Sequence, residues 1–278
     1  MNDITDTGPI LLLGGKGKTG RRVAQRLEAR GLEVRVGSRS AQPRFDWNDA
    51  TTWPTVLRGA SAVYITYQPD LSVDGAVEAI RAFVGAALEA GVRRMVLLTG
   101  RGEENAQRAE RVLQDSGADW TIVRASWFAQ NFSESFLFDS VLASEVALPI
   151  GGMKEPFIDA DDIAEVVVAA LTDAAHIGRL YEVTGPRLLT FAEAVGEIAE
   201  ASGREIRYRE MRPEDYVSLL EAHDVPSADI ALVMYLFTNL MDGRNESLAD
   251  GVERALGRPP RDFAAYVRET AATGVWNG

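Results

Sequence analysis

Residues 10–20 read Ile-Leu-Leu-Leu-Gly-Gly-Lys-Gly-Lys-Thr-Gly, and a helical pattern follows from Arg21 to Arg30. The apolar run predicts a strand, and the glycines that interrupt it predict a loop. A strand, a glycine loop and a helix in this order aim backbone N–H groups and the positive end of the helix at one point. The stretch therefore predicts an α/β fold that binds the pyrophosphate of a dinucleotide.

A second apolar run, residues 32–36, lies about one helix later and ends in Gly37-Ser38-Arg39. In dinucleotide folds the residue that closes the second strand faces the adenosine ribose, and sites that prefer NAD place an Asp or Glu there. A hydroxyl and a guanidinium suit a 2′-phosphate instead, because the guanidinium meets phosphate oxygens in two parallel hydrogen bonds. We therefore predict NADP(H) as the cofactor, with Lys18 adding positive charge and Thr19 donating to the pyrophosphate. The residues expected to bind it from this pattern are Gly14, Gly15, Gly17, Lys18, Thr19, Gly20, Ser38 and Arg39.

Composition excludes several kinds of site. The chain of 278 residues has no cysteine, which excludes disulfides, thiolate metal sites and cysteine nucleophiles. Its two histidines, His176 and His223, lie far apart, so no metal site is expected. A net charge of −12 argues against nucleic-acid binding, which needs a basic face. The polar first nine residues and the lack of a long apolar run predict a cytoplasmic protein that binds no membrane.

The first half of the chain alternates apolar runs with amphipathic stretches, which is the rhythm of a parallel sheet covered on both faces. After Pro186 the pattern changes to helices, with no alternation of strands and helices. We predict a Rossmann-like, doubly wound parallel sheet with a smaller, mostly helical C-terminal lobe. The NADP-binding domain is expected over residues 1–132 and 157–185, and the substrate-side lobe over residues 133–156 and 186–278. Expected strands are 10–13, 32–36, 44–45, 62–66, 93–99, 120–124 and 180–184; expected helices are 21–30, 51–57, 73–90, 103–116, 157–171, 190–202, 213–222, 227–241, 246–256 and 261–273.

Asp159, Asp161 and Asp162 open one of these helical patterns. Three carboxylates so close together are typical of a catalytic cluster, but acids at the start of a helix also satisfy N–H groups that have no helical partner. We interpret them as helix-capping residues.

The whole chain resembles the NmrA-like branch of the atypical short-chain dehydrogenases/reductases. The glycine loop and Ser38-Arg39 carry the resemblance, together with residues 120–132 (Trp-Thr-Ile-Val-Arg-Ala-Ser-Trp-Phe-Ala-Gln-Asn-Phe) and 157–164 (Phe-Ile-Asp-Ala-Asp-Asp-Ile-Ala). Within the branch it is most similar to bacterial relatives of the ergot-alkaloid reductases of the festuclavine dehydrogenase type. The resemblance implies a Rossmann sheet, a preference for NADP(H), and a substrate pocket over the nicotinamide.

The family pocket is bounded by loops that, in this sequence, begin at Thr66, Thr99 and Ser126, where an open parallel sheet has its ligand crevice. The resemblance adds Thr66 and Thr99 to the cofactor-binding residues. Aromatic walls would suit an apolar or aromatic substrate, although each aromatic residue also has the alternative of being a core residue. The expected pocket residues are Tyr67, Gln68, Thr99, Trp127, Phe128, Asn131 and Phe132.

The chain lacks the usual proton donor of its superfamily, because none of its seven tyrosines has a lysine four residues later. Lys16 and Lys18 belong to the glycine loop, and Glu110 reads as a solvated helix residue. The catalytic residues are therefore unknown. A site without a dedicated acid fits reduction of an iminium, or of an enone or quinone whose protonation comes later, with the reacting atoms held at roughly 3 to 3.5 Å.

Two functions stay open. The first is an NADPH-dependent reductase acting on a small-molecule substrate. The second is a redox sensor that binds NADP(H) without catalysis and acts through a protein partner. The sequence is compatible with a monomer or a homodimer.

Overall fold

The computed structural model describes residues 8–277. Its contacts divide the chain into two compact units. Unit 1 comprises residues up to 125, 160–183 and 250–259, and unit 2 comprises 126–159, 184–249 and the residues from 260 onward. The segment 250–259, which the sequence analysis placed in the helical lobe, thus packs with unit 1, and residues 126–132 and 157–159 pack with unit 2.

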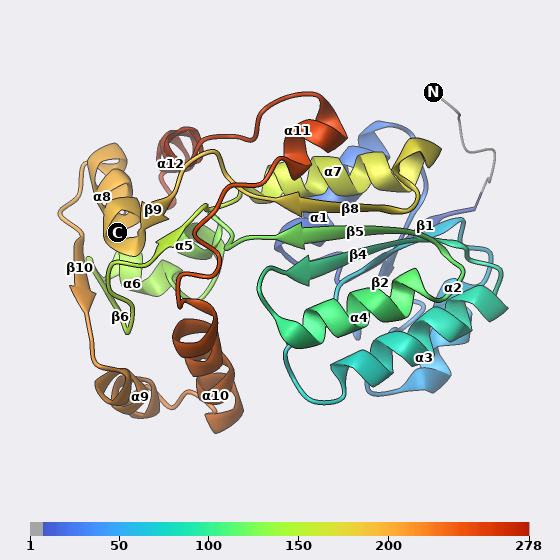
Figure 1. Cartoon of the computed structure of the whole chain (residues 1–278), viewed down its shortest axis with the longest axis horizontal. Coiled ribbons are helices and arrows are strands. Elements are labelled where there is room, and N and C mark those ends of the chain that lie inside the picture. The colour runs from blue at the N-terminus through green and yellow to red at the C-terminus, as the bar shows by residue number, and fades with distance from the viewer. Residues whose placement is uncertain (1–7, 278) are drawn as a thin grey trace. The chain divides into compact units, whose positions relative to one another are not determined.

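Unit 1 is built on a parallel sheet, which confirms the predicted Rossmann-like fold. Over residues 8–277, six strands form this sheet in the order β2-β1-β3-β4-β5-β8 (Figure 1). The order reverses direction after β1, so β1 and β3 lie side by side at the switch point where such sheets bind nucleotides. The strands are β1 (Ile10–Leu13), β2 (Val34–Gly37), β3 (Ala62–Ile65), β4 (Arg94–Gly100), β5 (Asp119–Ala125) and β8 (Arg179–Val183).

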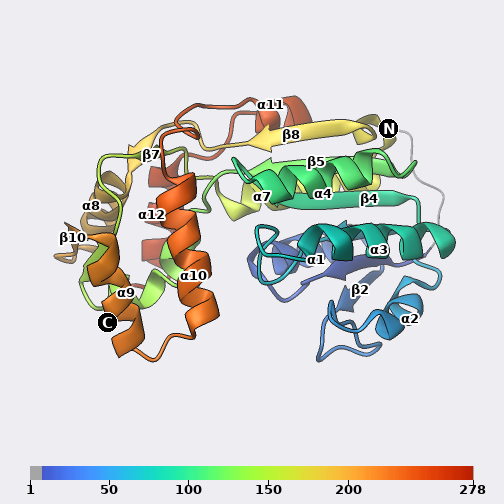
Figure 2. The same ribbon diagram turned by 60° about the horizontal axis from the view of Figure 1, so that its bottom comes forward.

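Two pairs of helices cover this sheet (Figure 2). Helix α1 (Lys18–Ala29) packs on α7 (Ala160–Thr172), and α3 (Ala76–Glu89) packs on α4 (Glu104–Gln114). Every residue of β1 and β3 is buried, as expected for strands covered on both faces. The remaining helices of unit 1 are η1 (Ala50–Thr52), α2 (Trp53–Leu57), η2 (Ala174–His176) and α11 (Gly251–Leu256).

The strand predicted at Arg44-Phe45 is wrong. The segment is irregular, and the amide of Phe45 donates to the carbonyl of Ser38 at 3.0 Å in the turn that follows β2. Its apolar character has another cause, because the Phe45 ring is buried and meets Trp47 edge-on at 5.1 Å. A single buried aromatic side chain gives the same short apolar signal as a strand.

The segment 250–259 is anchored on β8. Gly251 lies so close to this strand that an added Cβ would be 2.1 Å from the carbonyl oxygen of Glu182. The guanidinium of Arg254 lies 5.5 Å from the centre of the Tyr181 ring. Gly251 and Arg254 thus fix this segment to the sheet. The sequence pattern predicted only a helix here.

Unit 2 is mostly helical, but it also contains short strands that the sequence analysis missed. β6 (Glu145–Leu148) pairs in parallel with β10 (Arg207–Glu210), and β7 (Lys154–Glu155) pairs antiparallel with β9 (Leu189–Thr190). β10 reads Arg-Tyr-Arg-Glu with three exposed residues, so it lacks the apolar signal of a buried strand. The helices are α5 (Asn131–Glu134), α6 (Phe138–Leu142), α8 (Phe191–Ser202), α9 (Pro213–Ala222), α10 (Ser227–Tyr235), the π-helix η3 (Leu236–Leu240) and α12 (Phe263–Ala272).

A cluster of phenylalanines forms the centre of unit 2. Phe157 and Phe191 meet edge-on at 5.1 Å, and Phe132 and Phe263 pack beside them. Helix α8 begins with the capping box expected there, because the Thr190 hydroxyl accepts from the amide of Glu193 and the Glu193 carboxylate accepts from the amide of Thr190.

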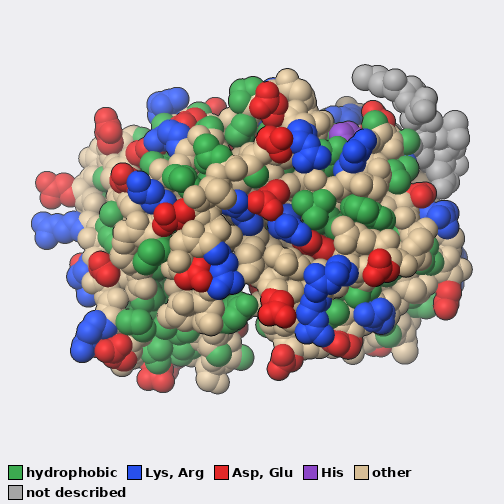
Figure 3. All heavy atoms as spheres, viewed as in Figure 1, with side chains coloured by type: hydrophobic (Ala, Val, Ile, Leu, Met, Phe, Trp, Pro, Cys, Tyr) green, Lys and Arg blue, Asp and Glu red, His purple; other side chains and the backbone are tan. Residues whose placement is uncertain are grey.

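On the face that Figure 3 shows, basic and acidic side chains are interspersed rather than gathered by sign. Among residues 8–277, no helix has both the length and the apolar content needed to cross a membrane.

Candidate nucleotide and substrate site

The glycine loop leads from β1 directly into α1, as the sequence predicts. Gly14 has φ +68°, a left-handed conformation that favours glycine, and a Cβ there would lie 2.4 Å from the Thr66 hydroxyl. A Cβ on Gly20 would lie 2.3 Å from the carbonyl oxygen of Gly14, so the first turn of α1 rests on the loop backbone. Within the described chain no side chain caps the start of α1. These features fit a pyrophosphate cradle at a helix N-terminus.

Thr19 and Lys18 differ in their surroundings. Thr19 is buried, and its hydroxyl accepts a hydrogen bond from the Tyr64 phenol of β3 at 2.9 Å. This bond turns the Thr19 hydroxyl toward the sheet, so a role in packing α1 on β3 accounts for the residue. Lys18 is half-buried, and its carbonyl accepts from Arg22 at 2.9 Å. Pyrophosphate contacts by Lys18 and Thr19 stay predictions.

The structure brings a residue not assigned from the sequence to the end of β2. The Lys16 ammonium donates to the Ser40 hydroxyl at 2.9 Å, and the hydroxyls of Ser38 and Ser40 lie 3.5 Å apart. Arg39 is exposed between the two serines. The Lys16 ammonium and two hydroxyls therefore lie together beyond β2, beside the exposed Arg39 in the sequence. Dinucleotide folds hold the adenosine ribose at this end of the second strand. The signal in the sequence was the lysine itself, at the third position of the loop.

Thr66 closes the end of β3 against β1. Its hydroxyl donates to the carbonyl of Leu13 at 2.9 Å, and its own carbonyl accepts from the indole of Trp47 at 3.2 Å. Tyr67 is half-buried against Trp47, with ring centres 4.9 Å apart, and burial raises the pKa of its phenol. Gln68 is exposed. In the loop after β3, Tyr67 is therefore held by packing, whereas the side chain of Gln68 is open to solvent.

Thr99 is held by Glu110, which corrects one interpretation from the sequence. The Thr99 hydroxyl donates to Glu110 at 2.7 Å, and Glu110 is 2 % exposed rather than solvated. Glu110 also binds Arg124, whose other end contacts Glu182 at 3.2 Å. The hydrogen bond to Glu110 raises the pKa of Arg124. The helical spacing gave no sign that an arginine on the neighbouring strand would bury this carboxylate.

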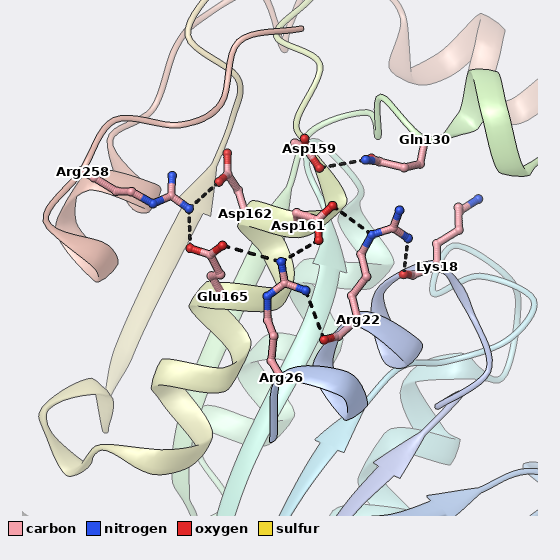
Figure 4. Close-up of polar contacts among 9 residues, drawn as sticks. All are labelled: Lys18, Arg22, Arg26, Gln130, Asp159, Asp161, Asp162, Glu165 and Arg258. Atoms are coloured by element: carbon pink, nitrogen blue, oxygen red, sulfur yellow. Dashed lines mark hydrogen bonds and ion pairs between the residues drawn. The ribbon is translucent and has the colours of Figure 1, made fainter. Parts of the chain in front are cut away.

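The acids predicted to cap α7 bind arginines and an amide (Figure 4). Asp161 accepts from Arg22 of α1, and Asp162, which is 0 % exposed, accepts from Arg258 at 2.7 Å. In unit 2, Asp159 accepts from Gln130 at 2.8 Å. These contacts give the three carboxylates structural roles that the capping interpretation did not include.

The predicted aromatic wall of unit 2 divides into buried and accessible residues. Phe132 is 0 % exposed, and its carbonyl accepts from the Trp276 indole at 3.0 Å, so its burial favours the core alternative. Phe128 and Asn131 are half-buried. Trp127 is half-buried and stacks on Phe237 at 5.6 Å.

The indole nitrogen of Trp127 is a buried donor with no hydrogen-bond partner in the described chain. The predicted pocket takes residues from both units, namely Tyr67, Gln68 and Thr99 from unit 1 and Trp127, Phe128, Asn131 and Phe132 from unit 2. Their assembly into one pocket stays a prediction.

A family model described as NAD(P)H-binding matches residues 14–174. The chain is 31% identical over 288 residues to agroclavine dehydrogenase of Claviceps fusiformis, with 96% of this chain and 98% of that protein covered. It is 28% identical to the NAD(P)H azoreductase of Xenophilus azovorans, with 95% and 98% covered. The match to the family model confirms the predicted class of cofactor, NAD(P)H.

Two solved structures share the fold. The triphenylmethane reductase of Citrobacter sp. complexed with NADP(H) has a TM-score of 0.76 at 17% identity, and 95% of this chain and 99% of that chain are covered. The quinone oxidoreductase QOR2 of Escherichia coli complexed with NADPH has a TM-score of 0.74 at 20% identity, with 94% and 99% covered. At these identities the similarity shows the fold alone.

Proposed function

The chain belongs to the NAD(P)H-binding, NmrA-like family, and from this premise we propose that it uses NADPH to reduce small, largely apolar iminium, enone or quinone-like acceptors. The oxidoreductase class follows from relatives named as dehydrogenases and reductases.

The end of β2 carries the proposal for NADPH. An NAD-preferring site has a carboxylate at this position. Here the chain has two cations, Lys16 and Arg39, and the two hydroxyls of Ser38 and Ser40. A carboxylate would repel a 2′-phosphate, whereas a guanidinium binds it through two charge-assisted hydrogen bonds. The cofactor, when bound, supplies a hydride; the protein holds and orients the two reactants.

The class of acceptor rests on the chemistry of the residues and on the named relatives. The chain has no Tyr-x-x-x-Lys pair, which disfavours ketones, because a ketone that receives hydride becomes an alkoxide that needs an acid at once. The similar proteins described above include agroclavine dehydrogenase, an azoreductase, a quinone oxidoreductase and a triphenylmethane reductase. The unpartnered indole N–H of Trp127 supports binding of an acceptor with an oxygen or nitrogen lone pair.

The test measures loss of NADPH absorbance with a panel of cyclic iminium ions, quinones, enones and simple ketones. We expect turnover with members of the first three groups and none with ketones. Binding titrations with the Arg39→Ala variant should show NADPH binding about 10- to 100-fold weaker and NADH binding unchanged. Arg58→Ala, which alters an exposed arginine, is the matched control.

Tight NADPH binding with a silent panel would support the redox-sensor alternative. Equal affinity of the wild type for NADPH and NADH would overturn the proposed cofactor preference.

A further inference from the structure

Glu103, the residue that precedes helix α4, carries a buried carboxyl group that the reaction described so far does not use. The residue is 6 % exposed. Its Oε2 atom is buried and has no hydrogen-bond partner in the described chain. Leaving a carboxylate oxygen unpaired in the interior is costly, so the structure favours the protonated form.

The carboxyl group of Glu103 lies at the carboxyl end of β4. A Cβ added to Gly100 would lie 1.9 Å from the Glu103 Oε1 atom, so the carboxyl group lies directly against this glycine. The preceding residue is Thr99, whose hydroxyl is fixed by Glu110. The carboxyl ends of β3 and β4 are the edge where an open parallel sheet holds its ligand.

The loop after β3 meets Glu103 with a second carboxylate. The negative charge of Asp70 acts on the Glu103 carboxyl group, and the Asp70 carboxylate accepts from the amide of Ser72 at 2.8 Å. The Ser72 carbonyl accepts from the Asn105 side chain of α4 at 3.0 Å, which ties the loop to the helix. Asp70 is half-buried, so it is the more accessible of the two acids to solvent.

The charges around Glu103 act in the same direction. Burial, and then the negative charges of Asp70 and Glu110, raise the pKa of Glu103 to about 8. Arg124, the arginine that binds Glu110, also contacts Glu182. Glu103 is therefore a neutral acid near pH 7, whereas an ordinary glutamate has lost its proton at this pH.

We propose that Glu103 is the proton donor for quinone acceptors, whose oxygen becomes a ring-stabilised anion rather than the strongly basic alkoxide of a ketone, an inference that rests on the proposed reductase function. A quinone gains a hydride on one atom and becomes an anion on its oxygen. The Glu103 O–H bond breaks, its proton goes to that oxygen, and Glu103 is left as a carboxylate. Asp70 passes a proton from water to Glu103, which restores the acid. An iminium carbon needs only the hydride, which quenches its positive charge, so it makes no use of Glu103.

The test compares a para-benzoquinone with an N-alkyl cyclic iminium ion. In Glu103→Gln we expect kcat for the quinone to fall about 100-fold or more, while kcat for the iminium stays within about threefold of the wild type. NADPH affinity should be unchanged. Glu104→Gln, which alters the exposed neighbour, is the control and should leave both rates unchanged.

A readout without turnover is the infrared carbonyl band of a protonated carboxylic acid. The band should be present at about pH 7, vanish as the pH is raised through about 8, and be missing in Glu103→Gln. Loss of this band at the pH of an ordinary glutamate would overturn the proposal. An equal fall in both rates, which marks structural damage, or no fall in either rate would also overturn it. A wild type that reduces neither acceptor would overturn the reductase function and the proton-donor role together.

Discussion

The Nε atom of Arg22 lies 3.2 Å from Oδ2 of Asp161, which joins the helix that starts at the glycine loop to helix α7 (Figure 4). Arg26, one turn later on α1, places Nη2 2.6 Å from the other oxygen of Asp161. One carboxylate thus holds two arginines of the same helix. The position of α1, and of the glycine loop before it, depends on a residue more than 130 positions away in the chain.

Asp161→Asn should lower the free energy of unfolding by about 1–2 kcal/mol, because it removes the carboxylate that Arg22 and Arg26 share and leaves Arg26 the longer contact with Glu165 at 3.6 Å. Denaturant unfolding near neutral pH measures this, with the exposed Asp74→Asn as the control. Burial acts to raise the pKa of Asp161, but Arg22 and Arg26 lower it overall. The stabilisation is therefore present above pH 3.8 and is lost as the pH falls through the lowered value. A constant difference between variant and wild type at all pH values would contradict this.

Gly20→Ala should damage the nucleotide site, because the new methyl group would meet the Gly14 carbonyl at 2.3 Å. We expect a loss of roughly 1–3 kcal/mol in stability and at least about tenfold weaker NADPH binding. Gly85→Ala is the matched comparison, since a Cβ there meets nothing within 4 Å inside helix α3. That change should stabilise the protein by roughly 0.5–1 kcal/mol. Similar thermal shifts for the two variants would refute the close packing at Gly20.

Lys16→Ala should weaken NADPH binding by about 5- to 20-fold and leave NADH binding unchanged, because the ammonium donates to Ser40, beside the expected position of the 2′-phosphate. The difference should shrink at high salt, since Lys16 is exposed. Fluorescence titration with both nucleotides measures it, and Lys154→Ala, which removes an exposed lysine of unit 2, is the control. A parallel loss of affinity for both nucleotides would place Lys16 at the pyrophosphate instead.

Glu103 should make the protein less stable as the pH rises. Its folded pKa is raised from 4.5 to about 8, so the folded state holds a proton that the unfolded state has lost. Stability is greatest below 4.5 and falls until the pH passes about 8. The advantage of Glu103→Gln over the wild type should grow by roughly 2–4 kcal/mol between about pH 5 and about pH 9. Chemical denaturation across this range checks it, and an advantage that stays flat would contradict the raised pKa.

Trp127→Phe should keep the aromatic contact with Phe237 and remove a buried donor that has no partner. We expect the free energy of unfolding to stay within about 1 kcal/mol of the wild type or to rise. If the indole N–H binds the acceptor, its KM should increase about 5- to 20-fold, with NADPH affinity unchanged. Unchanged acceptor kinetics would remove Trp127 from the pocket.

The strand, glycine loop and helix could be predicted because their signal is local. Strand, glycines and helix follow one another directly, and Gly14 and Gly20 are required by contacts inside that stretch. Lys16 was visible in the same loop, but its contact with Ser40 depends on how the loop meets the end of β2. A contact across 24 positions has no periodicity that a sequence pattern reveals.

The acids near β4 could not be predicted for a related reason. Glu103 and Glu110 follow the pattern of solvent-facing helix residues, yet both are buried. What buries them is the neighbouring strand, which supplies Arg124, and the loop that supplies Asp70. The short strands of unit 2 were missed because exposed residues such as those of β10 carry no apolar alternation.

The alternation of segments between the two units has a practical consequence for anyone who divides the gene. The polypeptide passes from one unit to the other after residues 125, 159, 183, 249 and 259, so each unit consists of three separate segments of the chain. No single cut releases either half intact. A fragment ending before residue 250 would strip β8 of the helix that covers it, and a nucleotide-binding half made for separate study would have to be rejoined by new linkers.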